Sequence, residues 1–591
     1  MATLPRNDVL AEQFDLLADL MELEGADGFR ISAYRKAAAR IRETPSSVAQ
    51  LALDGKAKLL QGIGKTIEGK IVEVVDDGEI HALTKRKADV PSEVATFMRL
   101  PGLGPKTARR IWKELGITTV DGLKAAAEAQ QLRGHAGIGA GTEEKIATAL
   151  AKPQAAHGPR RSLLGTTLPK LKAVVEELRE HPASVEVSLA GSARRMRETV
   201  RDLDIIATAS DPQALVDHFC ALPWVVDVAA RGSTKGTVVS HDGNRFDLRV
   251  VPPESYGNLL QHFTGSKNHN VALREDAVRR GFSVSEYAVT VVETGEEHRF
   301  AREEDVYRFL GYDWIPPELR EDGGELPAAR KGELPDLVQL ADLRGDLHTH
   351  TTWSDGKDPL EAMVDAAIKR GYAYYAICDH AQRLRGDLLQ RQSEQIDALN
   401  EIVKPFRILK GIEVNIRPDG TLDVSDDDLA TRDWVVASVH SRFDHAPMER
   451  VFAAMESPYV NCIGHVTNRK IGRRSPSQVD IEKIVEKALE TGTFLEINSQ
   501  PDRLDLTDVH ARAAREAGLK LVIDSDGHEI GALDYVELGV GQARRAWLTK
   551  DDVLNTRTWV QVEKLKKQGR RLDGAPKTGG GGVDAAGGKQ H

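Results

Sequence analysis

The sequence predicts a multidomain protein with an α-helical N-terminal region, an α+β middle region and a C-terminal barrel of alternating strands and helices. The first part, about 150 residues long, spaces its apolar side chains at helical intervals and contains repeated glycine turns. Strand-like runs that carry paired aspartates follow in the middle of the chain. Beyond residue 346, short apolar strands alternate with helices, and a histidine, aspartate or glutamate follows almost every strand.

Length and composition support several separate cores. The chain has 591 residues, of which 41% are hydrophobic and 29% charged, and this length exceeds that of a single domain. Cys220, Cys378 and Cys462 lie far apart and match no disulfide framework or zinc spacing, which indicates a reducing cytosol. No apolar run is long enough to span a membrane, and the N-terminus is unlike a signal peptide. We therefore expect a cytoplasmic protein with no membrane partner.

The N-terminal region contains three turns of the form glycine, apolar residue, glycine, and a helical stretch follows each turn. The turns comprise Gly62 and Gly64, Gly102 and Gly104, and Gly137 and Gly139, with Lys65 and Lys106 after the first two. Because glycine lacks a Cβ, the backbone N–H groups of such a turn can hold a DNA phosphate without reading a base. This repeated helix-hairpin-helix pattern predicts DNA binding, whereas one copy alone would also be typical of a plain connection between helices.

The formal net charge of −10 is unusual for a DNA-binding protein, which normally presents a basic surface. Net charge does not show where the charges lie, however, and a protein that holds several metal ions needs many carboxylates. The charge therefore does not exclude DNA as a partner.

Residues 191–204, GSARRMRETVRDLD, combine a phosphate-binding turn with a strand that carries two carboxylates. Side chains alternate along a strand, so Asp202 and Asp204 share a face and can hold a divalent metal ion. Gly191 lets the backbone approach a ligand closely, Ser192 supplies a hydroxyl, and Arg195 can donate to phosphate oxygens. Although an isolated pair of this kind is more often a surface pair, the combination predicts metal-assisted chemistry on a nucleoside triphosphate.

A second strand, residues 245–251, carries Asp247 as a potential third carboxylate. Three aspartates can hold two ions about 3.5–4 Å apart and so stabilise both oxygens of an in-line displacement. The segment FTGSK, residues 263–267, follows, and then a predicted helix. The motifs GSxRRxxxTVxDhD, FDLRVV and FTGSK resemble the palm and thumb of family X DNA polymerases, the repair polymerases of the polymerase beta type.

The resemblance implies a nucleotidyltransferase palm whose two ions, Mg²⁺ or Mn²⁺, are held by Asp202, Asp204 and Asp247. The residues that it assigns to the incoming deoxynucleoside triphosphate are Gly191, Ser192 and Arg195 at the phosphates, His262, Phe263 and Gly265 at the sugar, and Asn270 and Arg274 in the minor groove. One departure is Arg201, which stands where the family pattern has glycine. A large cation beside the metal strand would alter contacts to the triphosphate or the primer.

In that family the first hairpin lies in a small domain that grips the 5′-phosphate side of a gap. Lys70 falls at the position of the lysine that forms a Schiff base with an abasic sugar in some members, and such chemistry requires a lowered pKa. Lys65, Lys70 and Arg35 could instead contact phosphates alone. Residues 153–169, rich in proline, glycine and basic residues, predict a linker into the palm.

Residues 346–356, DLHTHTTWSDG, begin a further domain in which a strand places His348 and His350 on one face. Further candidate metal ligands lie at or after this strand and the later ones: Asp355, His380, Glu413, His440, His465, Asp526 and His528. A single histidine at the end of a strand is usually structural. Several at corresponding strand ends predict the active site of a parallel barrel.

These motifs resemble the PHP (polymerase and histidinol phosphatase) domain, a distorted (βα)7 barrel that holds three metal ions. The resemblance places His348, His350, Glu413 and Asp526 at one ion, Glu413, His440 and His465 at a second, and Asp355, His380 and His528 at the third. Imidazole mixed with carboxylate suits Mn²⁺, Zn²⁺ or Fe²⁺ better than Mg²⁺. We therefore expect metal-dependent hydrolysis of phosphodiesters.

The leading hypothesis is a bacterial-type family X DNA polymerase with a fused PHP domain. It would be a nucleoid-associated monomer that fills short gaps in gapped or nicked DNA during base excision repair, and would trim DNA by 3′–5′ exonuclease or abasic-site cleavage. The alternatives are a DNA-tethered PHP phosphoesterase with a vestigial polymerase, and a non-enzymatic DNA-binding scaffold. The expected domains are 1–90 and 91–155 (helical, DNA-binding), 156–255 (palm), 256–322 (thumb), 323–345 (linker), 346–572 (PHP) and 573–591 (disordered glycine-rich tail).

Overall fold

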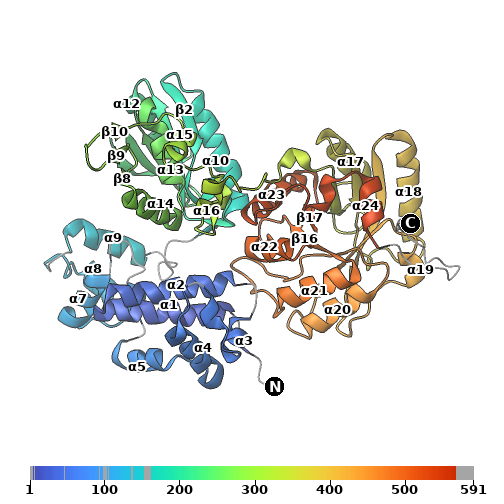
Figure 1. The fold of residues 1–591 in the computed structure, drawn as a ribbon, viewed down its shortest axis with the longest axis horizontal. Helices are drawn as coiled ribbons and strands as arrows, with labels where there is room; N and C mark the ends of the chain where they lie inside the picture. The colour runs from blue at the N-terminus through green and yellow to red at the C-terminus, as the bar shows by residue number, and fades with distance from the viewer. Residues whose placement is uncertain are drawn as a thin grey trace, which may run out of the picture. The chain divides into compact units, whose positions relative to one another are not determined.

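The computed structural model describes residues 4–5, 7–44, 47–60, 62–91, 93–97, 103, 105–134, 138–151 and 161–567. The chain divides into two compact units, Met1–Arg161 and Ser162–His591 (Figure 1). The predicted tail, residues 153–160 of the predicted linker, and Gly102, Gly104 and Gly137 lie outside the described residues. Within the described part, no helix combines the length and the apolar character that crossing a membrane requires.

The first unit is helical throughout its described residues. Its first helices are α1 (Asn7–Glu24), α2 (Gly28–Glu43), α3 (Val48–Leu53), α4 (Lys65–Asp77) and α5 (His81–Asp89). Leu10, Phe14 and Leu17 recur at helical spacing in α1, and all three are buried in the core of the unit. The side chain of Asp27 caps the N-terminus of α2.

Helices begin where the glycine turns predict them. The remaining helices of the unit are α6 (Val94–Phe97), α7 (Pro105–Leu115), α8 (Val120–Glu128) and α9 (Ala140–Ala151). Gly64 is the N-cap of α4, and α9 begins directly after Gly139. Gly62 has φ +83°, a conformation that favours glycine.

The second unit begins with a five-stranded sheet in the order β2-β4-β7-β6-β5. The strands are β2 (Ser184–Leu189), β4 (Asp202–Ala209), β5 (Val225–Arg231), β6 (Lys235–Ser240) and β7 (Arg245–Val250). β4 and β7 run parallel. Leu203 and Ile205 are buried with residues of α10 (Leu164–Arg179) and α12 (Pro212–Cys220), while Ile206 packs with α13 (Tyr256–Thr264). By alternation, Asp202 and Asp204 lie on the α13 side of the sheet.

The linker prediction is wrong for its last residues. β1 (Ser162–Leu163) pairs with β3 (Thr199–Val200), and α10 begins at Leu164 with Pro169 inside it. Proline removes one helical hydrogen bond, which costs stability. Leu164, Leu168 and Leu171 are buried at helical spacing, and we attribute the helix at this proline to their packing.

The region after α13 forms its own core. Its elements are α14 (Lys267–Arg279), β8 (Phe282–Val284), β9 (Val289–Val291), β10 (Glu297–His298), α15 (Glu303–Phe309) and α16 (Glu325–Lys331). The segment expected as a linker, 323–345, contributes Leu326 and Leu337 to this core, together with Leu319 and Tyr307. The segment contains few apolar residues, so its composition predicts a polar connector. Those few residues are nevertheless buried, and the segment is therefore part of the folded domain.

The C-terminal part is a parallel sheet whose strands follow in sequence order from β11 to β17. The strands are β11 (Gly345–Thr349), β12 (Tyr374–Ile377), β13 (Arg407–Asn415), β14 (Trp434–Ser438), β15 (Cys462–Ile463), β16 (Phe494–Asn498) and β17 (Leu521–Asp524). The intervening helices include α17 (Leu360–Lys369), α18 (Leu388–Ile402), α20 (Pro447–Glu456), α21 (Ile481–Thr491) and α22 (Asp508–Glu516), and α23 (Val536–Arg545) follows the last strand. A bridge between Thr349 and Gly527 brings the first strand against the end of the last. The predicted distorted (βα)7 barrel is confirmed.

Two candidate metal centres

The three palm aspartates lie together on neighbouring strands. In the register of β4 and β7, Asp204 is directly opposite Asp247, and Asp202 lies two residues away on the same face. Burial, followed by the charges of Asp247 and Asp202, raises the pKa of Asp204 to about 7. Carboxylates this close repel each other unless a cation lies between them, and oxygen ligands of this kind suit Mg²⁺ or Mn²⁺.

Cationic side chains of the protein itself contact the two outer carboxylates. Nε of Arg201 donates to Oδ2 of Asp202 at 2.8 Å, and Nε of Arg245 donates to Oδ2 of Asp247 at 3.0 Å. The hydroxyl of Thr237 also donates to Asp247, at 2.5 Å. Arg201, the departure from the family pattern, therefore contacts a predicted metal ligand directly.

The predicted phosphate-binding turn packs against this carboxylate cluster. Gly191 begins the short helix α11 (Gly191–Arg194) and has φ +63°. A Cβ at this position would lie 2.1 Å from Oδ2 of Asp204, so only glycine fits. Ser192 follows in the same helix, and Nε of Arg195 donates to Oε1 of Glu321 at 3.0 Å. Gly191 therefore lets the backbone approach the carboxylate of Asp204, a predicted metal ligand.

The residues predicted at the sugar and the minor groove form one hydrogen-bonded group. Nδ2 of Asn270 donates to the main-chain oxygen of His262 at 2.8 Å, and Arg274 contacts Nδ1 of His262 at 3.0 Å. Burial, and then the charge of Arg274, lowers the pKa of His262. The guanidinium of Arg249, two residues after Asp247, lies 4.5 Å from the ring centre of Phe263. This group therefore adjoins the aspartate cluster.

Gly265 completes the contact between the two groups. It has φ +70°, and a Cβ there would lie 3.0 Å from Nη1 of Arg195. That same nitrogen donates to the main-chain oxygen of Thr264. The predicted sugar segment and the predicted phosphate arginine are therefore in direct contact.

The nine candidate ligands of the barrel converge at the carboxyl ends of its strands, with Glu413 at the centre. Oε1 of Glu413 lies 3.5 Å from Nε2 of His348, 3.2 Å from Nε2 of His440 and 3.5 Å from Nε2 of His465. Oε2 lies 2.9 Å from Nδ1 of His380 and 3.6 Å from Nε2 of His350. The bridging role suggested for Glu413 fits this position.

The remaining ligands lie beside this centre. Nε2 of His350 is 3.2 Å from Oδ1 of Asp526. Oδ2 of Asp355 lies 3.6 Å from Nε2 of His380, and Oδ1 of Asp355 lies 3.5 Å from Nε2 of His528. Three overlapping sets have ligand atoms within 4.8 Å of one another: His350, Asp355, His380 and His528; His348, His350 and Glu413; and His380, Glu413 and His440.

The chemistry of these donors fits bound metal ions. Nε2 of His348, Nε2 of His350 and Oε1 of Glu413 are buried and make no hydrogen bond to the described residues. Buried polar atoms without partners are costly, and metal coordination would satisfy them. Burial lowers the pKa of His350 to about 4, so its imidazole is neutral, the form that binds metals. The imidazoles around Glu413 outweigh the effect of its burial and hold its pKa well below the usual range.

Comparisons with known proteins match several parts of the chain. The matching family models are a helix-hairpin-helix domain at residues 5–80, a SAM-like helix-hairpin-helix tandem at 94–152, the DNA polymerase beta thumb at 259–321 and the PHP domain at 346–529. The DNA polymerase/3′-5′ exonuclease PolX of Bacillus subtilis (strain 168) is 40% identical over 565 residues, which cover 94% of this chain and 98% of that protein. This chain belongs to the PolX family of DNA polymerases.

The barrel alone also matches other proteins. A protein named "Probable phosphatase" from Acetivibrio thermocellus is 30% identical over 206 residues, 32% of this PolX chain and 83% of the relative. A similarly named protein of Thermoanaerobacter sp. (strain X514) is 31% identical over 243 residues, 39% of this chain and 97% of the relative. These two relatives therefore match about a third to two fifths of this chain over most of their own length.

Sequence reasoning missed the residues that orient the ligands of the PolX barrel. Nδ1 of His348 lies 2.6 Å from Oε1 of Glu496, and Nδ1 of His440 lies 2.6 Å from Oδ1 of Asn415. These contacts direct the Nε2 atoms of both rings toward Glu413. Asn415 is the last residue of β13, and Glu496 lies in the middle of β16. A polar residue in an otherwise apolar, largely buried strand was the signal that could have identified them.

The N-terminal unit of this PolX chain places some of the predicted DNA contacts at its surface. Gly62, Gly64, Lys65 and Gly139 are exposed, and Lys70 is half-buried in α4. Lys106 is the second residue of α7, but its side chain is not among the described ones. Arg35 contacts Asp19 at 2.9 Å and Glu22 at 2.7 Å, so ion pairs already engage the phosphate contact suggested there.

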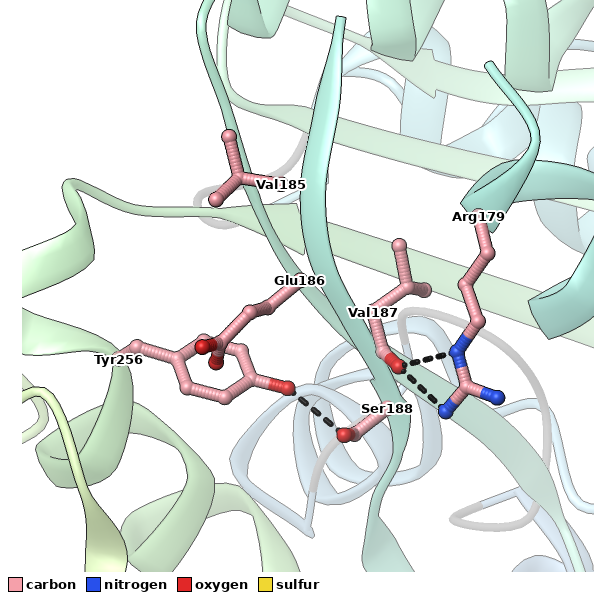
Figure 2. A pocket seen from close by; sticks show the side chains of 6 residues that line it. All are labelled: Arg179, Val185, Glu186, Val187, Ser188 and Tyr256. Carbon is pink, nitrogen blue, oxygen red and sulfur yellow. Dashed lines mark hydrogen bonds between the residues drawn. The ribbon is translucent and has the colours of Figure 1, made fainter. Parts of the chain in front are cut away.

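A pocket of about 440 Å³ lies apart from both predicted ligand sets, on the edge strand β2 of the PolX palm. Figure 2 shows that its polar groups bind each other: Arg179 donates to the main-chain oxygen of Val187, and the hydroxyl of Tyr256 donates to Ser188 at 2.7 Å. None of its lining residues belongs to the predicted sites. We assign it no part in the chemistry.

Proposed function

We propose that this PolX chain is a DNA polymerase that fills short gaps by template-directed nucleotidyl transfer and a metal-dependent 3′–5′ exonuclease. The observation that carries the proposal is that one chain gathers two separate ligand sets, three aspartates in the palm and nine groups in the barrel. Abasic-site cleavage at the barrel, and lyase chemistry at Lys70, remain finer proposals. The domain limits 1–90, 91–155, 156–255, 256–322, 323–345 and 346–572 are proposed as well.

In the palm, Asp202, Asp204 and Asp247 would hold Mg²⁺ or Mn²⁺, which neutralise triphosphate charge and activate the primer hydroxyl when bound. Ser192 and Arg195 would hold the phosphates through the hydroxyl and the guanidinium. Phe263 would pack on the sugar, where its bulk discriminates against a 2′-hydroxyl. These roles support polymerisation through positioning and charge, which is how phosphoryl transfer is generally catalysed.

In the barrel, the nine ligands would hold three ions such as Mn²⁺, Zn²⁺ or Fe²⁺, which supply a hydroxide for phosphodiester hydrolysis when bound. Glu413 is 1% exposed, whereas Asp355 is 46%, His528 33% and His440 28% exposed. The scissile phosphate would therefore approach from the side of these three residues. His350 stays neutral and so offers its nitrogen lone pair at the centre.

The partners follow from these activities. Gapped or nicked DNA and deoxynucleoside triphosphates would be the substrates, with the hairpins of Gly62, Gly64 and Lys65 holding DNA phosphates. We propose that the protein acts as a monomer on nucleoid DNA in the cytoplasm. Size-exclusion chromatography with light scattering tests the oligomeric state, and a dimer would overturn the proposal of a monomer.

Primer extension on gapped DNA and degradation of a 3′-labelled strand test the two sites separately. We expect Asp247→Ala to abolish extension and leave degradation intact, and His348→Ala to do the opposite. Extension by Asp247→Ala at the wild-type rate would refute the palm assignment. Degradation by His348→Ala at the wild-type rate would refute the barrel assignment.

A second candidate function for the barrel is hydrolysis of small phosphate monoesters, favoured by its likeness to the phosphatase-named relatives. Both substrates would use the same ligands. Competition separates them: if single-stranded DNA is the preferred substrate, it will inhibit hydrolysis of p-nitrophenyl phosphate at low concentration, while the monoester will barely slow DNA degradation. The reverse pattern would favour the phosphatase.

A further inference from the structure

Arg195, the arginine proposed to hold the triphosphate, is anchored by residues outside its own segment. Its Nε donates to Oε1 of Glu321 at 3.0 Å, and its Nη1 donates to the main-chain oxygen of Thr264. The side chain is largely buried. Glu321 is therefore one of two anchors that decide where the guanidinium points.

Arg545, the last residue of α23 in the barrel domain, reaches the same anchor. Its Nη1 donates to Oε1 of Glu321 at 3.0 Å and to the main-chain oxygen of Arg195 at 2.9 Å. Its Nη2 donates to Oδ2 of Asp508 at 2.6 Å. Because both arginines share one carboxylate oxygen of Glu321, Arg545 restricts where Glu321 can move and therefore where it can hold Arg195.

The same side of α23 also contacts the residue after Arg195. Met196 has φ +53°, a backbone conformation that residues other than glycine rarely adopt. A Cβ on Gly541 would lie 2.7 Å from Cε of Met196, and Nε2 of Gln542 donates to the main-chain oxygen of Met196 at 3.5 Å. Gly541 and Arg545 lie four residues apart and so share a helix face. A helix of the barrel thus holds the turn that carries Arg195.

We infer that Arg545 is a positioning residue of the polymerase site. From the barrel domain it fixes the backbone of Arg195 and the carboxylate of Glu321, so the guanidinium is ordered before a nucleotide arrives. A preordered group does not lose conformational freedom on binding, which strengthens nucleotide affinity. The inference rests on the proposed triphosphate role of Arg195. It makes the PHP domain a structural part of the nucleotide site, in addition to its own hydrolytic centre.

The test is Arg545→Ala in the full-length chain, with single-nucleotide gap filling measured over a range of deoxynucleotide concentrations. We expect KM for the nucleotide to rise about tenfold or more, as for loss of a hydrogen bond to a charged group, while kcat changes much less. Degradation of single-stranded DNA should stay at the wild-type rate. Arg545→Lys should restore part of the affinity, because lysine keeps the charge and one donor.

Glu537→Ala is the matched control. Glu537 lies on the same helix and pairs with Lys172 of the palm at 2.7 Å, a contact that involves neither Arg195 nor Glu321. Its loss loosens the same palm-barrel contact without touching the nucleotide site, so KM should stay near the wild-type value. A wild-type KM in Arg545→Ala, or an equal rise in both variants, would overturn the inference. If Arg545→Ala fails to fold by circular dichroism, Asp508→Asn, which weakens the anchor of Arg545 alone, gives the same comparison.

Arg195→Ala separates failure of this inference from failure of the proposed function. If Arg195→Ala leaves KM unchanged, the triphosphate role of Arg195 is wrong, and the positioning role falls with it. If Arg195→Ala raises KM but Arg545→Ala does not, only the positioning role is wrong. If both are right, the double variant will bind nucleotide no worse than Arg195→Ala alone, because Arg545 acts through Arg195.

Discussion

The palm and the barrel offer two different kinds of candidate metal site. The palm set consists of three aspartates on two adjacent strands, and Asp202 remains 29% exposed. The barrel set mixes imidazoles with carboxylates from six of the seven strands and is centred on buried Glu413. Open oxygen ligands suit ions that also bind substrate phosphates, whereas a buried imidazole set suits ions that remain in place. The two centres should therefore differ in how they respond to loss of a ligand and of metal.

The difference extends to folding. The palm set needs only the pairing of β4 with β7, which places Asp204 opposite Asp247. The barrel set needs the whole sheet to close, because its ligands lie at the ends of strands far apart in sequence. Metal ions should thus contribute to the stability of the barrel more than to that of the palm.

The largest effect should follow from removing the charge at the centre of the barrel. Glu413 faces five imidazoles, and Glu413→Gln keeps its shape but not its negative charge. We expect DNA degradation to fall by more than about 100-fold, the upper limit for a residue that only orients a ligand, with gap filling unchanged. Glu496→Gln, which orients His348, should cost about 10–100-fold. Equal losses in both variants, measured by release of labelled nucleotide, would contradict a central role for Glu413.

Chelation should destabilise the barrel and spare the palm. Ions that bind only the folded state add about 2.7 kcal/mol at a concentration 100 times their dissociation constant. We expect EDTA to lower the thermal unfolding midpoint of the wild-type chain by several degrees, and Mn²⁺ to restore it. In His348→Ala the same treatment should have little effect, whereas in Asp247→Ala it should act as in wild type. If EDTA instead fails to lower the unfolding midpoint of Asp247→Ala, the stabilising ions lie in the palm.

Much of this contrast could be predicted from the sequence. The spacing of Asp202 and Asp204 directly reflects the alternation of side chains along a strand. The nine candidate barrel ligands follow short motifs at or near the ends of strands. The pairing of Asp204 with Asp247 needed only the assumption that their strands are neighbours. The helix-hairpin-helix turns likewise predicted where α4 and α9 begin.

The residues that support these sites could not be predicted in the same way. Glu321 and Arg545 meet Arg195 only after distant parts of the chain have packed, and Glu496 is identified by its contact with His348 rather than by a motif. The helix at Pro169 depends on the packing of leucines against the sheet, which composition does not show. Local patterns therefore predicted which candidate residues come together, and tertiary packing determines which other residues hold them in place.

A smaller effect concerns how the ionisation of Asp204 changes the stability of the metal-free protein. The pKa of Asp204, about 7, lies above its usual 3.8, so the folded state binds more protons than the unfolded state between these values. Stability without metal therefore falls as pH rises through this window. We expect chelated Asp204→Asn to be more stable than wild type at pH 8, by about 1–3 kcal/mol, with the advantage shrinking toward pH 4. Urea unfolding in EDTA at both pH values measures it, and equal stabilities at pH 8 would show that neither burial nor the neighbouring carboxylates destabilise the ionised form of Asp204.

The smallest effect should come from Arg201, which contacts Asp202 in competition with any metal ion. This ion pair is more than half exposed on the arginine side, and exposed pairs are worth about 0.2–1 kcal/mol. We expect Arg201→Ala to tighten Mn²⁺ binding to the palm by at most about fivefold, measured by electron paramagnetic resonance of free Mn²⁺ in a His348→Ala background. Arg231→Ala, which removes a comparable arginine from Asp217 on the same domain, is the control and should leave the affinity unchanged. Weaker binding in Arg201→Ala would mean that this arginine orients Asp202 for the ion instead of competing with it.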